Sequence, residues 1–226
     1  MQRALSVLIW LLLSIGGVLG QARPATCNCP KTVYADTQAQ ATFHLANGKT
    51  IILCGDKNTR TKPVSFAEFV LFVCGQKKII GFWESRRTCQ LVVSKDTLLV
   101  NHIANLPVGK GFAYESTTWV VEKIYFSGIR VMRKVDLNRS YPRYSAAKIA
   151  TVLKAFERAH SGLDDAKLTL ADELFVATLS GSNQARGYLK KFETKFGVLD
   201  GYFGEDYYEL MSMLQLWDKK GSWQKP

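Results

Sequence analysis

The chain has 226 residues, a formal net charge of +11 at pH 7 and a hydrophobic content of 47%. A chain of this size can bury roughly 70% of its unfolded surface, so disulfides help its folding but are not obligatory. After the first 20 residues no segment is long and apolar enough to span a membrane, which excludes a transmembrane helix from the mature chain. We expect one large domain or two small ones.

Residues 1–20 have the pattern of a cleaved signal peptide. Arg3 provides the positive start, residues 4–13 form the apolar stretch, and small residues follow as far as Gly20. The alternative is a retained membrane anchor, which we rank lower because a glycine pair interrupts an apolar run that is already short for a bilayer. We therefore expect export through a cleaved signal peptide and a periplasmic or extracellular location.

Five cysteines lie in the first third of the mature chain: Cys27, Cys29, Cys54, Cys74 and Cys89. An exported protein meets an oxidising environment, so we expect two disulfides and one cysteine left over. Neighbours in a C-x-C pattern rarely bridge each other, so Cys27 or Cys29 should tie the N-terminal segment to the sheet through one of the other three. The alternative is a soft-metal site, which we rank lower because no histidine lies near Cys29 in the sequence. We expect no metal and no other cofactor.

The residue pattern divides the chain into a β-rich region and a helical region. Residues 41–137 contain repeated short runs of Val, Ile, Phe, Tyr and Thr between turn residues, which predicts six to eight antiparallel strands joined as hairpins. Apolar residues recur at helical spacing after Pro142, which predicts about four helices. The predicted fold class is therefore α+β, with a β-rich basic region 21–142 and a helical region 143–226 that can pack on the sheet as one domain.

The first predicted hairpin turns at Asn47-Gly48. This dipeptide suits a two-residue type I′ turn, in which both residues have positive φ. Such a turn pairs Phe43 with Ile52 and puts Cys54 on the face of the core residues.

The second predicted hairpin turns near Lys95 and pairs Val93 with Leu98. The register set by this pair places Cys89 opposite His102. A facing cysteine and histidine form either a nucleophile with its base or two metal ligands. We favour the structural alternative, a disulfide-bonded Cys89 beside a hydrogen-bonded histidine.

The third predicted hairpin turns at Ser127-Gly128 and places Glu122 opposite Arg133. An opposite-charge pair in the middle of an otherwise apolar face predicts a buried ion pair, because neither charge is tolerated there alone. The functional alternative is a ligand site at this position, which we rank below a satisfied cross-strand pair.

Polar residues mark the starts of the predicted helices. Ser145 and Ser182 are placed to cap two helices, and Thr169 with Asp172 has the spacing of a capping box. The last helix should begin near Glu205, where acidic residues favour the positive end of the helix dipole.

The positive charge belongs to the β-rich region. Residues 21–142 contain 17 lysines and arginines against 8 acidic residues, whereas residues 143–226 contain 12 against 11. Basic side chains at turns are exposed and attract anionic surfaces over a long, salt-dependent range. We therefore expect an anion-binding set made of Lys57, Arg60, Lys62, Arg86, Arg87, Arg130, Lys134 and Arg139. Nucleic acid is a disfavoured partner because these loops lack the interleaved aromatic residues that stack on bases.

No catalytic motif in the sequence is specific. Ser145 and Lys148 match the S-x-x-K pattern of acyl-transferring serine enzymes, but the partner motifs of those enzymes are absent. The low-ranking catalytic candidates are Cys89, His102, Glu122, Ser145 and Lys148. The favoured function is thus an exported, non-enzymatic binding protein whose basic sheet meets an anionic surface, a polysaccharide or an acidic protein. The alternative is a cell-envelope hydrolase with a site between the sheet and the helices.

Overall fold

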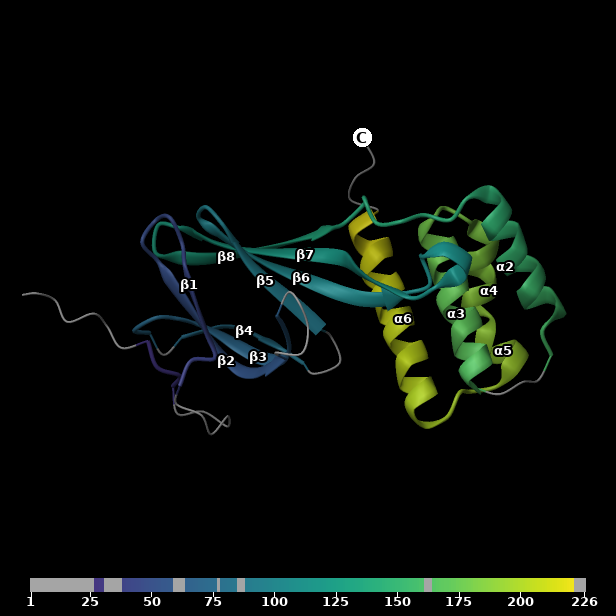
Figure 1. The fold of residues 1–226 in the computed structure, drawn as a ribbon, viewed down its shortest axis with the longest axis horizontal. Coiled ribbons are helices and arrows are strands. Elements are labelled where there is room, and N and C mark those ends of the chain that lie inside the picture. Colours follow the sequence, from purple (N-terminus) through teal and green to yellow (C-terminus); the bar gives the residue numbers. More distant parts are fainter. Residues whose placement is uncertain are drawn as a thin grey trace, which may run out of the picture.

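The computed structural model describes residues 27–30, 38–58, 64–76, 78–84, 88–160 and 164–221. The predicted signal peptide lies outside these residues. Within them, an antiparallel sheet in residues 41–137 precedes a bundle of helices, so the predicted α+β class is confirmed (Figure 1). None of the described helices is both long and apolar enough to cross a bilayer.

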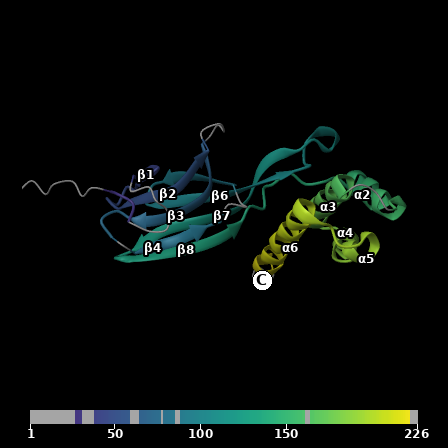
Figure 2. The same cartoon turned by 90° about the horizontal axis from the view of Figure 1, so that it is seen from below.

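Eight strands form the sheet in the order β1-β2-β3-β5-β6-β7-β8, and β4 pairs with β3 beside this path. Their bounds are β1 (Ala41–His44), β2 (Thr50–Asn58), β3 (Ser65–Val73), β4 (Ile79–Trp83), β5 (Thr88–Ser94), β6 (Thr97–Leu106), β7 (Glu115–Ser127) and β8 (Arg130–Leu137). The sheet is curled, as Figure 2 shows, and a side chain of β8 reaches β4. Arg133 on β8 links the two strands, because its Nη1 donates to the carbonyl oxygen of Ile80 at 3.3 Å.

The curled sheet encloses an apolar core made by alternate side chains of its strands. Its fully buried members include Ile51, Phe69, Leu98 and Ile124. Trp83 closes this core, since its ring stacks on that of Phe69 with centroids 4.9 Å apart.

The register of the second hairpin is as predicted, because its turn is the short one at Lys95. Val93 pairs with Leu98, and Cys89 lies opposite His102. The third hairpin turns one residue later than predicted, at Gly128-Ile129 instead of Ser127-Gly128. Each residue of β7 therefore pairs with a residue two positions further along β8 than predicted. Glu122 therefore lies opposite Val135 and not opposite Arg133. A shift of two keeps every side chain on its predicted face.

The predicted register of the first hairpin is wrong by one residue. Phe43 pairs with Ile51, because residues 45–49 form a longer loop in place of a two-residue turn. Only Gly48 has positive φ there, and the Asn47 side chain instead accepts a hydrogen bond from the Lys49 amide at 3.0 Å. A slip of one residue moves side chains to the other face of a sheet. Cys54 thus lies on the outer face.

Two disulfides, Cys27–Cys74 and Cys29–Cys54, tie the N-terminal segment to that outer face. Cys29 and Cys54 pack there with Ile52, Val70 and Phe72 in a small second cluster. Cys89 belongs to neither disulfide, so its predicted disulfide is wrong. Structural disulfides indicate an oxidising compartment.

Five helices follow the sheet in the described part of the chain, one more than the approximate number predicted. They are α2 (Ala146–Arg158), α3 (Asp164–Leu179), α4 (Asn183–Lys190), α5 (Phe192–Phe196) and α6 (Gly201–Gly221). Ser145 and Ser182 cap α2 and α4 as predicted, by accepting backbone hydrogen bonds from Lys148 and Ala185.

The predicted capping box at Thr169 is wrong. Helix α3 begins at Asp164, and Thr169 lies inside it, where its hydroxyl donates to the carbonyl oxygen of Asp165. Asp172 is consequently a mid-helix residue whose side chain is available for contacts outside α3.

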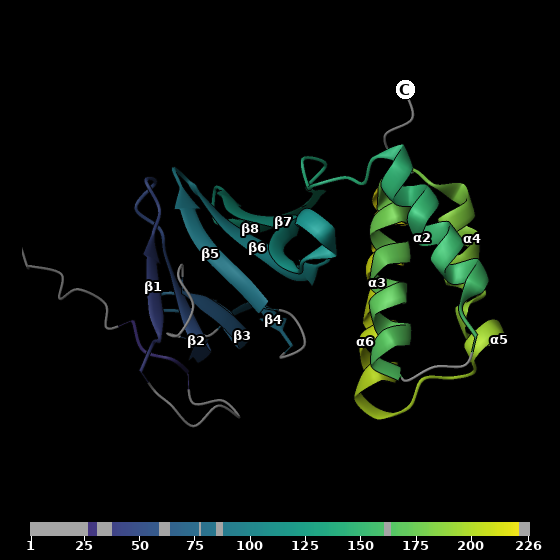
Figure 3. The same cartoon turned by 45° about the vertical axis from the view of Figure 1, so that its right-hand side comes forward.

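The helical half has its own core, to which one end of the sheet contributes. Leu106 of β6 and Trp119 and Val120 of β7 belong to the same buried cluster as the helix residues. In Figure 1 α6 is the helix nearest to the sheet, and Figure 3 shows it behind α3.

The loop between β6 and β7, residues 107–114, attaches the sheet to the helical half and contains a short 3₁₀ turn, η1 (Lys110–Phe112). The Tyr144 hydroxyl donates to the carbonyl oxygen of Pro107 at 2.5 Å, and Lys148 Nζ donates to that of Gly109 at 3.0 Å. From the loop itself, the Tyr114 hydroxyl donates to Asp172 Oδ2 at 2.6 Å. The two halves are thus joined by a second connection besides the chain after β8.

Candidate functional site

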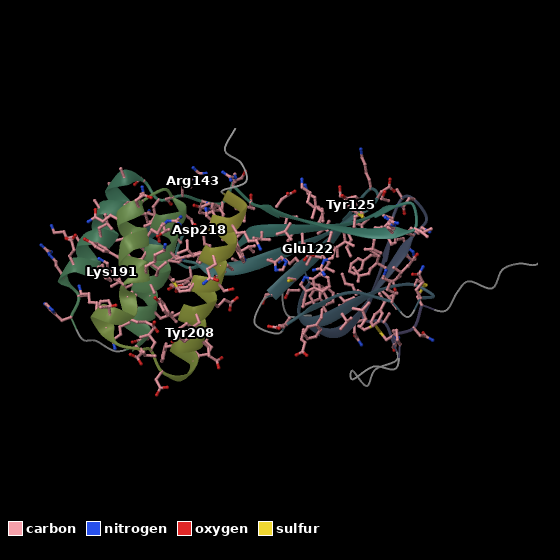
Figure 4. The ribbon with its side chains drawn as sticks, turned by 180° about the vertical axis from the view of Figure 1, so that it is seen from behind. Glu122, Tyr125, Arg143, Lys191, Tyr208 and Asp218 are labelled. Carbon is pink, nitrogen blue, oxygen red and sulfur yellow. A yellow bond between two sulfur atoms is a disulfide. The ribbon has the colours of Figure 1, made fainter. Side chains whose placement is uncertain are left out.

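Two cavities flank α6 where it faces the sheet. The first, here called the sheet cavity, has a volume of about 470 Å³ and lies between α6 and strands β4, β6, β7 and β8. Figure 4 labels a residue from each wall, Glu122 in the sheet and Tyr208 on α6. The second, here called the helix cavity, has a volume of about 570 Å³ and lies between α6, α3 and the ends of β5, β6 and β7. Both volumes fall within the range typical of small-molecule sites.

A buried polar network forms the floor of the sheet cavity. Glu122, only 3% exposed, accepts a hydrogen bond at Oε1 from Arg133 Nε at 2.5 Å. Its Oε2 lies 3.7 Å from His102 Nε2. On the other side of the imidazole ring, Nδ1 lies 3.7 Å from the Sγ atom of Cys89. The sequence candidates Cys89, His102, Glu122 and Arg133 are therefore brought together.

The partners of Glu122 keep it ionised. Burial raises the pKa of this carboxyl, but the contacts with His102 and Arg133 outweigh burial and hold the pKa below its usual value. A carboxylate of lowered pKa is a weak general base and a strong acceptor for cations. The predicted ion pair thus exists, formed diagonally across the strands.

The thiol of Cys89 does not reach the cavity. Its side chain is 0% exposed, and the residues lining the sheet cavity include His102 and Glu122 but not Cys89. A nucleophile must meet its substrate within bonding reach. The arrangement therefore orients His102 and does not present a nucleophile.

Aromatic rings form the walls of the sheet cavity. Phe82 and Trp83 come from β4, Trp119 from β7 and Tyr208 from α6. The guanidinium of Arg133 lies over the Trp83 ring, 5.0 Å from its centroid, so one ring face already binds a cation of the chain itself.

The helix cavity combines acidic and aromatic side chains. Asp165, Asp172, Asp206 and Glu209 line it, together with Tyr114, Trp119, Tyr202 and Phe203. Burial is the largest cause that raises the pKa of Asp172; together with the nearby charges of Asp206 and Glu173 it brings the pKa to about 7, against the lowering effect of the hydrogen bond from Tyr114. No basic side chain of the described chain forms an ion pair with Asp172 or Asp206.

This acidic surface was not predicted from the sequence. Asp172 was interpreted as part of a helix cap, and the acidic residues of α6 as helix-dipole partners. The available signal was the spacing of Tyr202, Asp206 and Glu209, which at i, i+4 and i+7 share one helix face.

The serine–lysine candidate does not assemble. Lys148 Nζ donates to the carbonyl oxygen of Gly109, and its ammonium lies over the rings of Phe112 and Tyr144, 4.6 and 4.4 Å from their centroids. The ammonium is thus engaged away from Ser145, whose hydroxyl serves as a helix cap.

The anion-binding set is described only in part. Lys57, Arg130, Lys134 and Arg139 are exposed, whereas Arg60, Lys62, Arg86 and Arg87 lie outside the described residues. Arg130 begins β8 and Arg139 follows its end, so they are separated by the length of the strand, about 25 Å at 3.3 Å per residue. Lys134 pairs with Asp136 at 3.3 Å.

Comparisons with protein-family models, with curated proteins and with solved structures found no match for this chain.

Proposed function

We propose that this chain is an exported binding protein whose sheet cavity takes a ligand with a positively charged nitrogen beside an apolar part. The two disulfides and the signal-like N-terminal sequence support export. The rest of the proposal depends on the charges and rings that line the cavity.

The observation that carries the proposal is the acidic lining of a cavity in a basic protein. Among the described residues that line the sheet cavity, Glu84, Glu122 and Glu209 are acidic and Arg133 is basic. Arg133 is already bound to Glu122, so it is not available to a ligand as a free cation, and acidic side chains outnumber basic ones among the described lining residues. Opposite charge attracts strongly in a partly desolvated space.

The aromatic walls favour an organic cation over a hydrated metal ion. An alkylammonium or arylammonium group gains from the electron-rich faces of indole and phenol rings, and its carbon skeleton gains from leaving water. The described residues contain no group of three or more histidine, cysteine or acidic side chains placed to hold a metal.

The hydrolase alternative has weaker support. The cavity holds His102 and Glu122, but the pKa of Glu122 is lowered and Cys89 lies outside the lining. A binding protein requires neither a poised base nor an accessible nucleophile.

The test compares benzylammonium with benzyl alcohol, which has the same ring and no charge. We expect benzylammonium to bind about tenfold more tightly, since one favourable charge contact is worth about 1 kcal/mol or more. Glu209→Gln should weaken benzylammonium binding about fivefold without affecting the alcohol. Glu205→Gln, on the same helix and outside both cavity linings, is the matched control. Protein NMR titration gives both dissociation constants, and equal affinity for amine and alcohol would refute the proposal.

A second candidate function is attachment to an anionic surface through the sheet, as the charge of residues 21–142 favours. Lys57, Arg130 and Arg139 are exposed and form no ion pair with another described residue. Such side chains remain available to a polyanion. This function does not compete with the first, because these residues do not line either cavity.

A further inference from the structure

Four connections between strands lie at the end of the sheet that is remote from the helices. In an antiparallel sheet successive connections alternate between the two ends, so this end carries the connections 45–49, 74–78, 95–96 and 128–129. The helical half joins the opposite end through residues 107–114 and 138–145, as Figure 1 shows. The described residues of these four connections, together with residue 130, are called the turn end below.

The loop 45–49 holds the turn end together. The Ala46 amide donates to the carbonyl oxygen of Lys95 at 3.0 Å, and the Cys74 amide donates to that of Thr50, the residue after the loop, at 2.9 Å. The ammonium of the lysine in this loop lies 6.0 Å from the ring centroid of Phe126, near the end of β7. The four connections therefore form one surface and not four separate tips.

Basic side chains outnumber acidic ones at the turn end. The basic residues are Lys49, Lys78, Lys95 and Arg130, of which Lys49 is half-buried and the others are exposed. Asp96 is the one acidic residue among the described members of this surface. None of these five residues forms an ion pair with another residue that the structure describes. The turn end thus presents positive charge that complements an anionic surface.

An isoleucine stands at the tip of this positive surface. Ile129, which is 91% exposed, follows Gly128 in the two-residue turn between β7 and β8. Turn positions ordinarily carry small or polar residues, and this side chain gains nothing from the core. A residue that breaks a local rule without a structural gain is expected at functional sites. Ile79, 52% exposed at the start of β4, is a second apolar side chain at this end.

Lys95 is held at the turn end in a strained backbone conformation. Its φ is 52°, in the left-handed region that L side chains rarely adopt, and glycine occupies the equivalent position of the β7–β8 turn, at Gly128. Strain of this kind leads from an observed outlier to a hypothesis of function. Here its effect is to place a cation on the exposed surface where glycine would fit with less strain.

The N-terminal part of the chain joins the described structure at the same end. Cys27 is bonded to Cys74 there, and residues 1–26 precede it in the sequence. They include the apolar stretch 4–13 of the signal-like sequence. A bilayer that holds this stretch during export is therefore connected to the protein at the turn end and not at the helices.

We propose that the turn end docks on an anionic lipid bilayer, with Ile129 inserted among the acyl chains and the basic side chains against the headgroups. An apolar anchor and a basic patch together hold a protein on a membrane more firmly than either does alone. This inference rests on the second candidate function, because it assigns the anionic surface and the part of the sheet that meets it. Docking by this end leaves the cavities beside α6 clear of the membrane.

The test is sedimentation of the mature protein with vesicles made of equal parts of phosphatidylcholine and phosphatidylglycerol, at low ionic strength. We expect binding to these vesicles and none to vesicles of phosphatidylcholine alone. Ile129→Ser should weaken binding about tenfold, because the inserted side chain loses its burial in hydrocarbon. Lys95→Gln should weaken it about fivefold, since one cation near an anionic membrane is lost.

Each variant has a matched control on the helical half. Val198→Ser removes an apolar side chain that is 72% exposed between α5 and α6, and Lys154→Gln removes an exposed cation from α2. Both controls should bind the anionic vesicles as wild type does. Loss of binding by the controls equal to that of the turn-end variants would overturn the assignment of the docking surface.

A second assay, retention on a sulfated polysaccharide matrix, separates this inference from the function on which it rests. Ile129→Ser should elute from the matrix with wild type, because a polysaccharide has no hydrocarbon interior. If the protein binds the matrix but not the anionic vesicles, the inference is overturned in favour of an acidic polysaccharide and the second candidate function stands. If Ile129→Ser binds the vesicles as wild type does, insertion is overturned and attachment by charge alone stands. If the protein binds neither, both fall.

Discussion

Asp172 shows how one residue responds to its surroundings. It lies on α3 and faces Tyr114 from the β6–β7 loop, Asp206 from α6 and Glu173 of its own helix. Burial raises its pKa to about 7, so this carboxyl takes up and releases a proton near neutrality. Its charge, and therefore the charge of the helix cavity, changes over the range in which most proteins operate.

We predict that Asp172 makes folding stability depend on pH. Because its folded-state pKa lies above its ordinary value, protonation stabilises the folded protein fully below about pH 4, and this contribution is lost as the pH rises through about 7. Replacement Asp172→Asn removes the effect. Urea unfolding from pH 5 to pH 8 should show the variant gaining stability relative to wild type, by about 3 kcal/mol at most. Parallel curves for the two proteins would contradict this.

The variant Tyr114→Phe tests the same pH dependence through the hydrogen-bond partner of Asp172. The Tyr114 hydroxyl lowers the pKa of Asp172, so its removal should move the titration of Asp172 to higher pH. The stability difference between Tyr114→Phe and the double variant with Asp172→Asn should then develop at a higher pH than in the wild-type background.

At the scale of the elements, Arg133 links two strands that are not neighbours in the sheet. Arg133 of β8 reaches both Glu122 of β7 and the backbone of Ile80 in β4. Its guanidinium also covers the Trp83 ring, which closes the sheet core. One side chain therefore joins three strands and shapes the sheet cavity.

We predict that Arg133→Met destabilises the protein by about 2–4 kcal/mol, because it leaves the Glu122 carboxylate buried without its main partner. The double variant with Glu122→Gln should recover part of the loss, since the uncompensated charge is gone. Arg133→Lys should fall between wild type and Arg133→Met, because lysine keeps the charge but not the planar fork. Urea unfolding measures all four proteins. An Arg133→Met protein as stable as wild type would remove the proposed role of the link.

The outcome for the hairpins shows what the sequence can predict at this scale. Local turn chemistry determines register, so the short turn at Lys95 allowed Cys89 to be placed opposite His102. At Asn47 the side chain competes for a backbone amide and lengthens the loop, which no residue count reveals. Ser145 and Ser182 were predictable caps because capping is local. Thr169 has the sequence pattern of a helix cap but lies inside α3. The start of this helix depends on packing and not on a local pattern.

At the scale of the whole molecule, exposed basic side chains lie on the sheet surface, whereas acidic side chains line the two cavities beside α6. The sequence analysis placed positive charge on the β-rich region, and Lys57 and Arg130 are exposed there. The acidic lining of the cavities could not be predicted in this way, because it comes from strands and helices more than 100 residues apart in sequence, such as β4 and α6. Residues that come together from such distant segments leave no periodic pattern in the sequence.

The anionic-surface function is tested by chromatography of the full mature chain on a sulfated matrix. Attraction between exposed charges weakens with salt, so Arg130→Glu and Lys57→Glu should each elute at lower salt than wild type. Asp206→Asn, at a half-buried position in the helix cavity, should elute with wild type or slightly later. Identical elution of all four proteins would exclude a contribution of these two basic residues.

The second connection between the halves has a consequence for what can enter between them. While Pro107, Gly109 and Tyr114 stay fastened to the helices, the gap beside α6 keeps a constant width. An α-helix with its side chains is about 10–12 Å across, far thicker than a single stretched chain. Because these contacts oppose widening, the space beside α6 should select ligands by their thickness.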